Sequence, residues 1–173
     1  MTTIDYLEKQ YAHVFDMVKF AEMKNTILIA FDGAIIFGMA KLLNAVNSIY
    51  LYYFLLYAMA MCCISIFISL FALVAKIKHS TNNTSLAQND NLLFFATLAQ
   101  MTHVDLIEKI RTQYRCDSSN ENHEKDLARQ VIITSQIAVR KFKLFNVAMA
   151  LTFSGLLTPL SLIVYEVFLD KGR

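Results

Sequence analysis

The chain has 173 residues, a length that fits one domain, and 56% of them are apolar while only 17% are charged. Soluble domains carry about 25% charged residues, so this composition favours insertion into a membrane. The formal net charge is only +2, which excludes bulk attraction to nucleic acid. The three cysteines form no CxxC pair, so neither a disulfide framework nor a zinc site is predicted.

The first 25 residues are predicted to form an amphipathic cytosolic helix. Their apolar side chains recur every three or four positions, which places them on one face of a helix over residues 3–24. They are Ile4, Leu7, Tyr11, Val14, Val18 and Ala21. Acidic residues interrupt this region, so it does not match a signal peptide. We expect this helix to pack on the rest of the cytosolic part; a position flat on the lipid surface is the alternative.

Three apolar runs predict three transmembrane helices. Ile27–Leu43 has 17 residues, close to the minimum for a span, and Ile49–Ala75 has 27 without a single charge. The short polar segment between them predicts an antiparallel transmembrane hairpin over residues 26–77. A third run, Leu144–Leu169, predicts the last span within residues 142–173, with a kink at Pro159. The predicted fold is therefore an all-α integral membrane protein.

Asp32 is the most unusual residue of the first apolar run. A carboxylate at mid-depth in a membrane costs about 2.5–3.5 kcal/mol on insertion scales, so such residues commonly mark function. A pore lining, a proton site and a contact between subunits all remain open. Proximity to water, or to Lys24 and Lys41 of a neighbouring chain, would explain Asp32 without a function, and so would protonation of its carboxylate. Gly33, beside it, and Gly38 would allow a close approach of helices.

The segment between the hairpin and the last span, residues 78–141, is predicted to be a cytosolic helical hairpin. Residues 79–90 are polar and aperiodic, which indicates a loop. One helix is expected from Asp90 or Asn91 to Tyr114, followed by a turn over residues 116–122. A second helix is expected to begin near Glu121 and, because no helix breaker follows, to continue into the last span.

Basic residues next to the apolar runs predict the orientation. Lys76, Lys78, Arg140, Lys141 and Lys143 flank the segment 79–139, whereas the loop at 44–48 has no basic residue. By the positive-inside rule, this segment and the N-terminal helix face the cytoplasm, and the C-terminus lies outside. Lys171 and Arg173 argue against the last point.

No catalytic or cofactor-binding motif is present. The sequence has no GxxxxGK, GxGxxG or GxSxG pattern, and its four histidines are scattered, so we expect no enzyme, no cofactor and no metal site. The cytosolic segment is instead rich in arginine and lysine. Solvated helix faces, together with charges that set the membrane topology, explain this richness. The sharper interpretation is an anionic ligand held by arginines, with an aromatic ring stacked on the base of that ligand. The candidate ligand residues are Arg111, Tyr114, Arg115, Arg129 and Gln130.

Several segments resemble a known family. They are Phe20–Lys24 with Ile27–Ala34, Phe94–Ala96, Leu127–Gln130, Ile137–Ala138 and Lys141–Phe142. This pattern is similar to the membrane effectors of Pycsar antiphage systems, relatives of the two-span effectors found beside bacterial nucleotide-signalling enzymes. The resemblance covers about residues 18–165, and Asp32 stands where the family pattern often has asparagine.

The resemblance implies a partner nucleotide cyclase that makes cyclic CMP or cyclic UMP on infection. The effector would sense this cyclic mononucleotide in the cytosol, oligomerise or rearrange, and impair the inner membrane, causing abortive infection. Two other functions fit the residues alone. A constitutive small channel would use Asp32 and Gly33, with Lys24 nearby, along its path. A membrane anchor would use the cytosolic segment as a docking surface.

Overall fold

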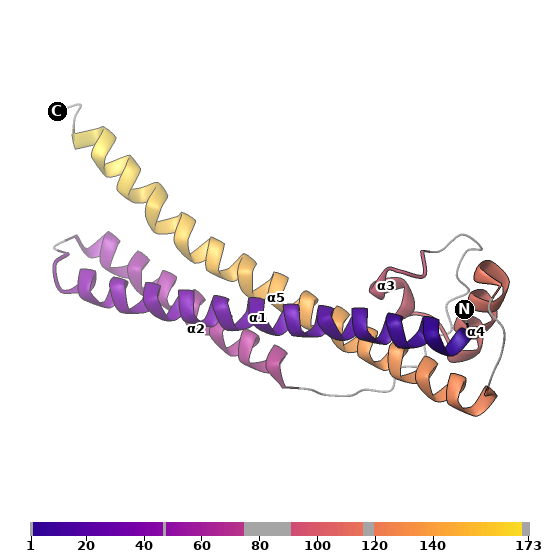
Figure 1. Cartoon of the computed structure of the whole chain (residues 1–173). Coiled ribbons are helices and arrows are strands. Elements are labelled where there is room, and N and C mark those ends of the chain that lie inside the picture. Colours follow the sequence, from indigo (N-terminus) through magenta and orange to yellow (C-terminus); the bar gives the residue numbers. More distant parts are fainter. Residues whose placement is uncertain (1, 47, 75–90, 116–119, 171–173) are drawn as a thin grey trace. The chain divides into compact units, whose positions relative to one another are not determined.

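The computed structural model describes residues 2–46, 48–74, 91–115 and 120–170, with side chains up to residue 158. This part of the chain confirms the all-α prediction (Figure 1). The helices are α1 (Thr3–Leu43), α2 (Ile49–Leu73), α3 (Phe95–Leu98), α4 (His103–Tyr114) and α5 (Glu121–Asp170). The predicted loop at 79–90, most of the turn at 116–122, and Lys76, Lys78, Lys171 and Arg173 lie outside the described residues.

The chain divides into two compact units. Unit 1 comprises Met1–Glu22 and Ala75–Phe142, and unit 2 comprises Met23–Val74 and Lys143–Arg173. Unit 1 thus contains most of the N-terminal 25 residues and the segment between the hairpin and the last apolar run. Unit 2 corresponds to the three apolar runs.

Helix α1 is a single helix of 41 residues that joins the predicted amphipathic helix to the first apolar run. A reciprocal cap starts it: the amide of Thr2 donates to Asp5 at 2.9 Å, and the amide of Asp5 donates to the hydroxyl of Thr2 at 3.2 Å. The hydrogen bond from the Thr2 amide holds the pKa of Asp5 below its usual value. No glycine or proline precedes Gly33 in this helix, so nothing in the sequence ends it near residue 25.

The region after residue 90 differs from the prediction of one helix ending at Tyr114. Asn91 forms a turn instead of a cap, with its side chain accepting from the amide of Leu93 at 2.9 Å. After the single turn of α3, Thr102 interrupts the helix and starts α4, because its hydroxyl accepts the amide of Asp105 at 3.2 Å. Gln136 of α5 donates to the carbonyl of Ala99 at 3.1 Å and so satisfies the end of α3.

Helix α5 runs for 50 residues from Glu121 and confirms the predicted unbroken helix. It passes through residue 142, where unit 1 ends, and continues past Pro159 to Asp170. The same helix thus contributes to both units.

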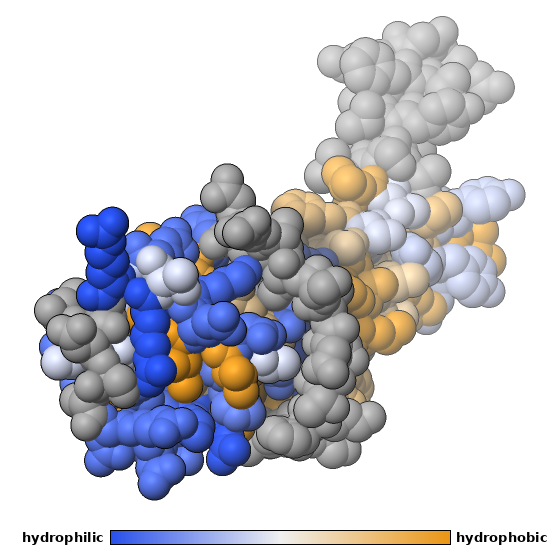
Figure 2. All heavy atoms as spheres, turned by 90° about the vertical axis from the view of Figure 1, so that its right-hand side faces the viewer, coloured by the Kyte–Doolittle hydropathy of each residue, from blue (hydrophilic) through white to orange (hydrophobic). Residues whose placement is uncertain are grey.

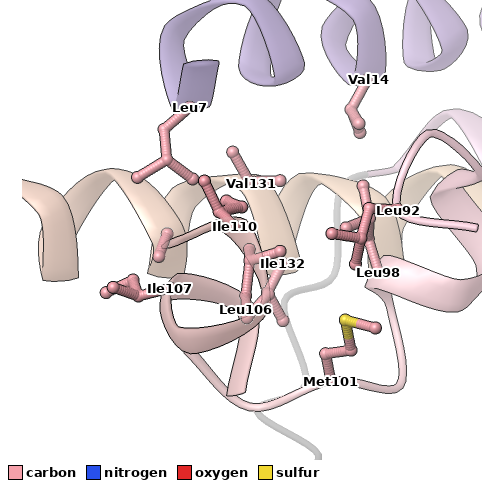
Figure 3. Packing of buried hydrophobic residues seen from close by; sticks show 11 residues of the cluster. Leu7, Val14, Leu92, Leu98, Met101, Leu106, Ile107, Ile110, Val131 and Ile132 are labelled. Atoms are coloured by element: carbon pink, nitrogen blue, oxygen red, sulfur yellow. The ribbon is translucent and has the colours of Figure 1, made fainter. Parts of the chain in front are cut away.

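Unit 1 has an apolar core formed by α1, α4, α5 and the segment around α3 (Figure 3). Its central members are fully or almost fully buried. They are Leu7, Val14, Leu92, Leu98, Met101, Leu106, Ile107, Ile110, Ala128, Val131 and Ile132. The stripe predicted for the first helix is confirmed at its four buried positions, Leu7, Val14, Val18 and Ala21. Burying a side chain such as Leu7 or Ile110 contributes about 1.5–3 kcal/mol, so this core explains why α1 and α4 pack on α5.

Unit 2 has the opposite distribution of side chains. The buried positions of α2 are mostly small or polar: Leu55, Ala58, Cys62, Ser65, Ser69 and Ala72. Its large apolar side chains point outward, including Phe31, Phe37, Tyr53, Phe67, Phe71, Phe153 and Leu157. In water this arrangement would expose a large apolar surface, which monomeric soluble proteins rarely do.

Helices α1 and α2 are long and apolar enough to cross a membrane. Only 17% of the most apolar stretch of α1 and 28% of that of α2 are buried within the protein, so neither behaves as the core helix of a soluble domain. Figure 1 shows α2 returning alongside α1 as the second arm of a hairpin. The predicted hairpin is thus consistent with a membrane location.

Helix α5 approaches α2 very closely at Gly155. A Cβ atom at this position would lie 3.0 Å from Cβ of Met61 and 3.2 Å from the carbonyl oxygen of Ala58. By contrast, Gly33 and Gly38 on α1 have open space where a side chain would be. Small residues that permit backbone contact are the usual means of packing helices in lipid.

Candidate functional site

Three of the five predicted ligand residues lie together at the end of α4. Arg111 and Tyr114 belong to its last turns, and Arg115 is its C-terminal cap. The helix is fixed on its other face by Leu106, Ile107 and Ile110, which are buried in the core of unit 1. Figure 2 shows that hydrophilic residues dominate the face of unit 1 turned to the viewer.

Arg111 forms an ion pair with a residue that the sequence did not single out as functional. Its guanidinium donates to the carboxylate of Glu124 at 2.5 Å. The Glu124 side chain is completely buried, whereas that of Arg111 is 39% exposed. Glu124 also lies in the first turn of α5, where the helix dipole favours a negative charge. Arg111 therefore neutralises a buried carboxylate and joins α4 to α5.

Tyr114 packs against Tyr6 of α1, with the ring centroids 4.8 Å apart and the planes tilted by 31°. Tyr114 is still 41% exposed, so part of its ring is open to solvent. Arg115 is exposed and has a φ of 50°, the only positive φ among described residues other than glycine. Left-handed conformations of this kind are uncommon outside glycine and often occur at functional sites.

The other two predicted ligand residues lie on the exposed side of α5. Arg129 is 3.7 Å from the carboxylate of Asp126, one turn earlier on the same helix. Gln130 is exposed, and its backbone carbonyl accepts a hydrogen bond from the hydroxyl of Thr134 at 2.7 Å. The adjacent positions 131 and 132 face the core, so Arg129 and Gln130 are turned away from it.

The start of α5 should respond to acid through Glu121. Its carboxylate accepts the ammonium of Lys125 at 2.7 Å, and this bond lowers the pKa of Glu121 below its ordinary value. A lowered folded-state pKa gives stabilisation that is complete above the ordinary value and is lost as the pH falls through the lowered one. We expect the protection of the amides near residue 121, relative to their intrinsic exchange rates at each pH, to fall on acidification. Glu121→Gln should remove the pH-dependent stabilisation that comes from the Glu121–Lys125 ion pair. If that variant responded to acid as the wild type does, this assignment to Glu121 would be wrong.

Asp32 lies inside unit 2 and joins all three of its helices. The carboxylate is fully buried, and its oxygens lie 2.9 and 3.2 Å from the hydroxyl oxygen of Thr152 on α5. The same Thr152 oxygen is 2.9 Å from the hydroxyl of Ser65 on α2 and 3.2 Å from the carbonyl of Ala148. The sequence singled out Asp32 but neither partner, because hydroxyl residues are common in membrane helices and give no distinctive signal.

Gly33 follows Asp32 directly on α1, and the structure brings neither Gly33 nor Lys24 to the Asp32 carboxyl group. Gly33 is exposed. Lys24 lies 5.4 Å from the centre of the Phe145 ring, in cation–π geometry. Asp32 is thus separated from both by its position on the buried side of α1.

Lys141, which the sequence assigned to membrane topology, has a structural role in unit 1. Its side chain is only 4% exposed and donates to Glu22 of α1 at 2.7 Å. Phe142 follows Lys141 on α5 and Phe20 lies two residues before Glu22 on α1, and the centroids of these two rings are 6.3 Å apart. This residue therefore ties α1 to α5, a pairing over 119 positions that no local pattern could reveal.

Comparison with known proteins gives one result. Residues 6–168 match the Pycsar effector protein domain, PycTM. No curated protein and no solved structure matches the chain. The matched region contains most of both units. It extends at both ends beyond residues 18–165, the range over which the individual segments resemble the family. The chain therefore belongs to the PycTM family of Pycsar effector proteins.

Proposed function

We propose that this protein is an antiphage effector of the bacterial inner membrane that is activated by cyclic CMP or cyclic UMP from a partner cyclase. Binding to unit 1 in the cytoplasm makes the protein oligomerise or rearrange, and unit 2 then impairs the membrane. The effector does not modify its ligand. Family membership supports the signal and the target, and the residue distribution in unit 2 supports its place in the bilayer.

The exposure of large apolar side chains is the observation that carries this proposal. Phe67 and Phe71 of α2 and Phe153 and Leu157 of α5 are all more than half exposed. Lipid chains solvate such side chains, whereas water does not. The same exposure on α5, among its side chains described up to residue 158, supports residues 144–169 as the third span, so that all three helices of unit 2 would lie in the membrane.

Arg115 is the arginine best placed to hold a ligand phosphate. Arg111 is engaged with buried Glu124, and Arg129 with Asp126. Among the residues that the structure describes, Arg115 has no hydrogen-bond or ion-pair partner. Beside it, the partly exposed ring of Tyr114 can stack on a pyrimidine base. Arginine binds phosphate through two parallel donors, which makes it suitable for a cyclic nucleotide.

The outer face of α1 supports self-association. Ala30, Ala34 and Gly38 are exposed and follow one another at intervals of four residues, so they form one line along the helix. Intervals of this kind between small residues promote close helix pairing in lipid. The homo-oligomer would use this face of α1.

The direct test is a membrane-potential dye in bacteria that express the protein with its cyclase. We expect depolarisation only when the cyclase is active and supplies one of the two nucleotides. A catalytically inactive cyclase is the matched control. Depolarisation without nucleotide would show a constitutive channel instead, and no depolarisation under any condition would favour the membrane anchor.

Replacing Arg115 by alanine tests the ligand site. A charge-assisted hydrogen bond contributes about 1.5–3 kcal/mol, so roughly 10- to 150-fold more nucleotide should be needed for half-maximal depolarisation. Arg140→Ala is the matched control because Arg140 is exposed on α5, eleven residues beyond Arg129. Equal nucleotide requirements for Arg115→Ala and the control would show that the ligand binds elsewhere.

A further inference from the structure

Asp32 is the only acidic residue among the described side chains of unit 2. The basic residues of this part are Lys24 and Lys41 on α1 and Lys143 on α5, while α2 has no charge. Along α1, Lys24 and Lys41 are about 12 and 13.5 Å from Asp32 at 1.5 Å per residue. Each contacts a ring instead: Lys24 that of Phe145, and Lys41 that of Phe37 at 4.7 Å. Lys143 is exposed.

The carboxyl group therefore has no basic counter-charge among the described residues. Its hydrogen-bond partner there is the hydroxyl of Thr152, at 2.9 Å. The titratable group that faces it from α2 is the buried thiol of Cys62, and no titratable side chain of α5 within residues 144–158 is available to face it. A buried carboxylate that lacks a paired charge is strongly unfavourable, whereas a neutral carboxyl group needs only ordinary hydrogen bonds.

The surrounding oxygens can serve a protonated carboxyl group without moving. Each hydroxyl supplies one donor and two acceptor sites. With Asp32 protonated, its O–H donates to Thr152, and Thr152 donates to Ser65 or to the carbonyl of Ala148, at 2.9 and 3.2 Å. With Asp32 ionised, Ser65 donates to Thr152 and Thr152 to Asp32. Rotation of two hydroxyls thus converts one pattern into the other.

We propose that Asp32, Thr152 and Ser65 form a proton-binding site at the centre of unit 2, with the proton on the Asp32 carboxyl group. The site is additional to the nucleotide site and rests on the proposed location of unit 2 in the bilayer. A bound proton keeps α1, α2 and α5 joined through neutral hydrogen bonds. Its release leaves a buried negative charge served by a single hydroxyl, so proton occupancy controls how firmly α5 packs on the hairpin.

Infrared spectroscopy of the full chain in lipid vesicles tests this directly. At about pH 7 ordinary carboxyl groups are ionised, so a carbonyl stretching band of a protonated carboxylic acid would be conspicuous. We expect this band in the wild type, its loss in Asp32→Asn, and its retention in Glu22→Gln, since Glu22 is partly exposed and ion-paired. In Thr152→Val the band should shift, because the carboxyl group loses its hydrogen-bond partner; a purely structural role of Thr152 would not move it.

Two results would overturn the proposal. The first is the absence of the band at this pH in wild-type protein whose circular dichroism shows that it is folded and helical in the vesicles. The second is a band that added sodium ions abolish at constant pH, which would identify a sodium site. Neither result bears on nucleotide-dependent depolarisation, so the two proposals can fail separately.

Discussion

Arg111→Ala should destabilise unit 1 by about 3 kcal/mol, the usual cost of removing one partner of a buried ion pair. The cost is large because the remaining carboxylate of Glu124 is completely buried and cannot reach water. Amide exchange in α4 should then accelerate about 100-fold, at one factor of ten for each 1.4 kcal/mol. Hydrogen exchange followed by mass spectrometry would measure this change.

A second substitution distinguishes this mechanism from a simple loss of packing. Adding Glu124→Gln to Arg111→Ala removes the negative charge that Arg111 neutralised and should recover most of the lost protection. Glu124→Gln alone should cost less than Arg111→Ala, because the guanidinium is 39% exposed and retains water as a partner. If Arg111→Ala left exchange unchanged, Glu124 would not be a buried anion in the working protein. A lost nucleotide response in Arg111→Ala is therefore no proof that Arg111 touches the ligand.

Gly155→Leu should have the largest effect in unit 2. A Cβ atom there would already lie 3.0 Å from Cβ of Met61, so a leucine must force α5 away from α2. Overpacking of this kind typically costs about 1–3 kcal/mol, and it would also separate Thr152 from Ser65. Thermal unfolding of the detergent-solubilised protein, followed by circular dichroism, should show a lower midpoint.

Alanine substitutions at two glycines provide the matched comparison. Alanine favours a helix over glycine by about 1 kcal/mol, so Gly33→Ala, with open space around it and outside the line of Ala30, Ala34 and Gly38, should be neutral or stabilising. The unfolding midpoint of Gly155→Ala should lie below that of Gly33→Ala, because the contacts with Met61 and Ala58 oppose the same gain. Equal midpoints for the two variants would show that α2 and α5 are not in close contact in the solubilised protein.

Local sequence patterns predicted the features that depend on local physics. The stripe from Leu7 to Ala21, the start of α5 near Glu121 and its lack of an internal end follow from periodicity and from the absence of helix breakers. The same reasoning missed the break before Thr102. The hydrogen bond from the Asp105 amide to the Thr102 hydroxyl favours a new helix start over continuation of α3. The break also involves a distant residue, because Gln136 of α5 donates to the carbonyl of Ala99, 37 positions away.

The buried polar contacts that the sequence missed all depend on partners from another helix. Glu124 looks like an ordinary surface residue of a helix start until α4 brings Arg111 to it. Thr152 meets Asp32 across 120 positions, and hydroxyl residues carry no pattern that announces such a contact. The composition of a helix indicates that it can enter a membrane, but only packing decides which of its polar residues meet.

The side-chain distribution of unit 2 also sets how freely its sequence can change. In the proposed membrane location, outward positions such as Phe67 and Leu157 face hydrocarbon chains, where one large apolar side chain substitutes for another with little consequence. Inward positions such as Ala58 and Ser65 leave no room for growth. Permissible variation is therefore greatest where a water-soluble protein allows least, among the bulky apolar residues. It is narrowest among the small ones.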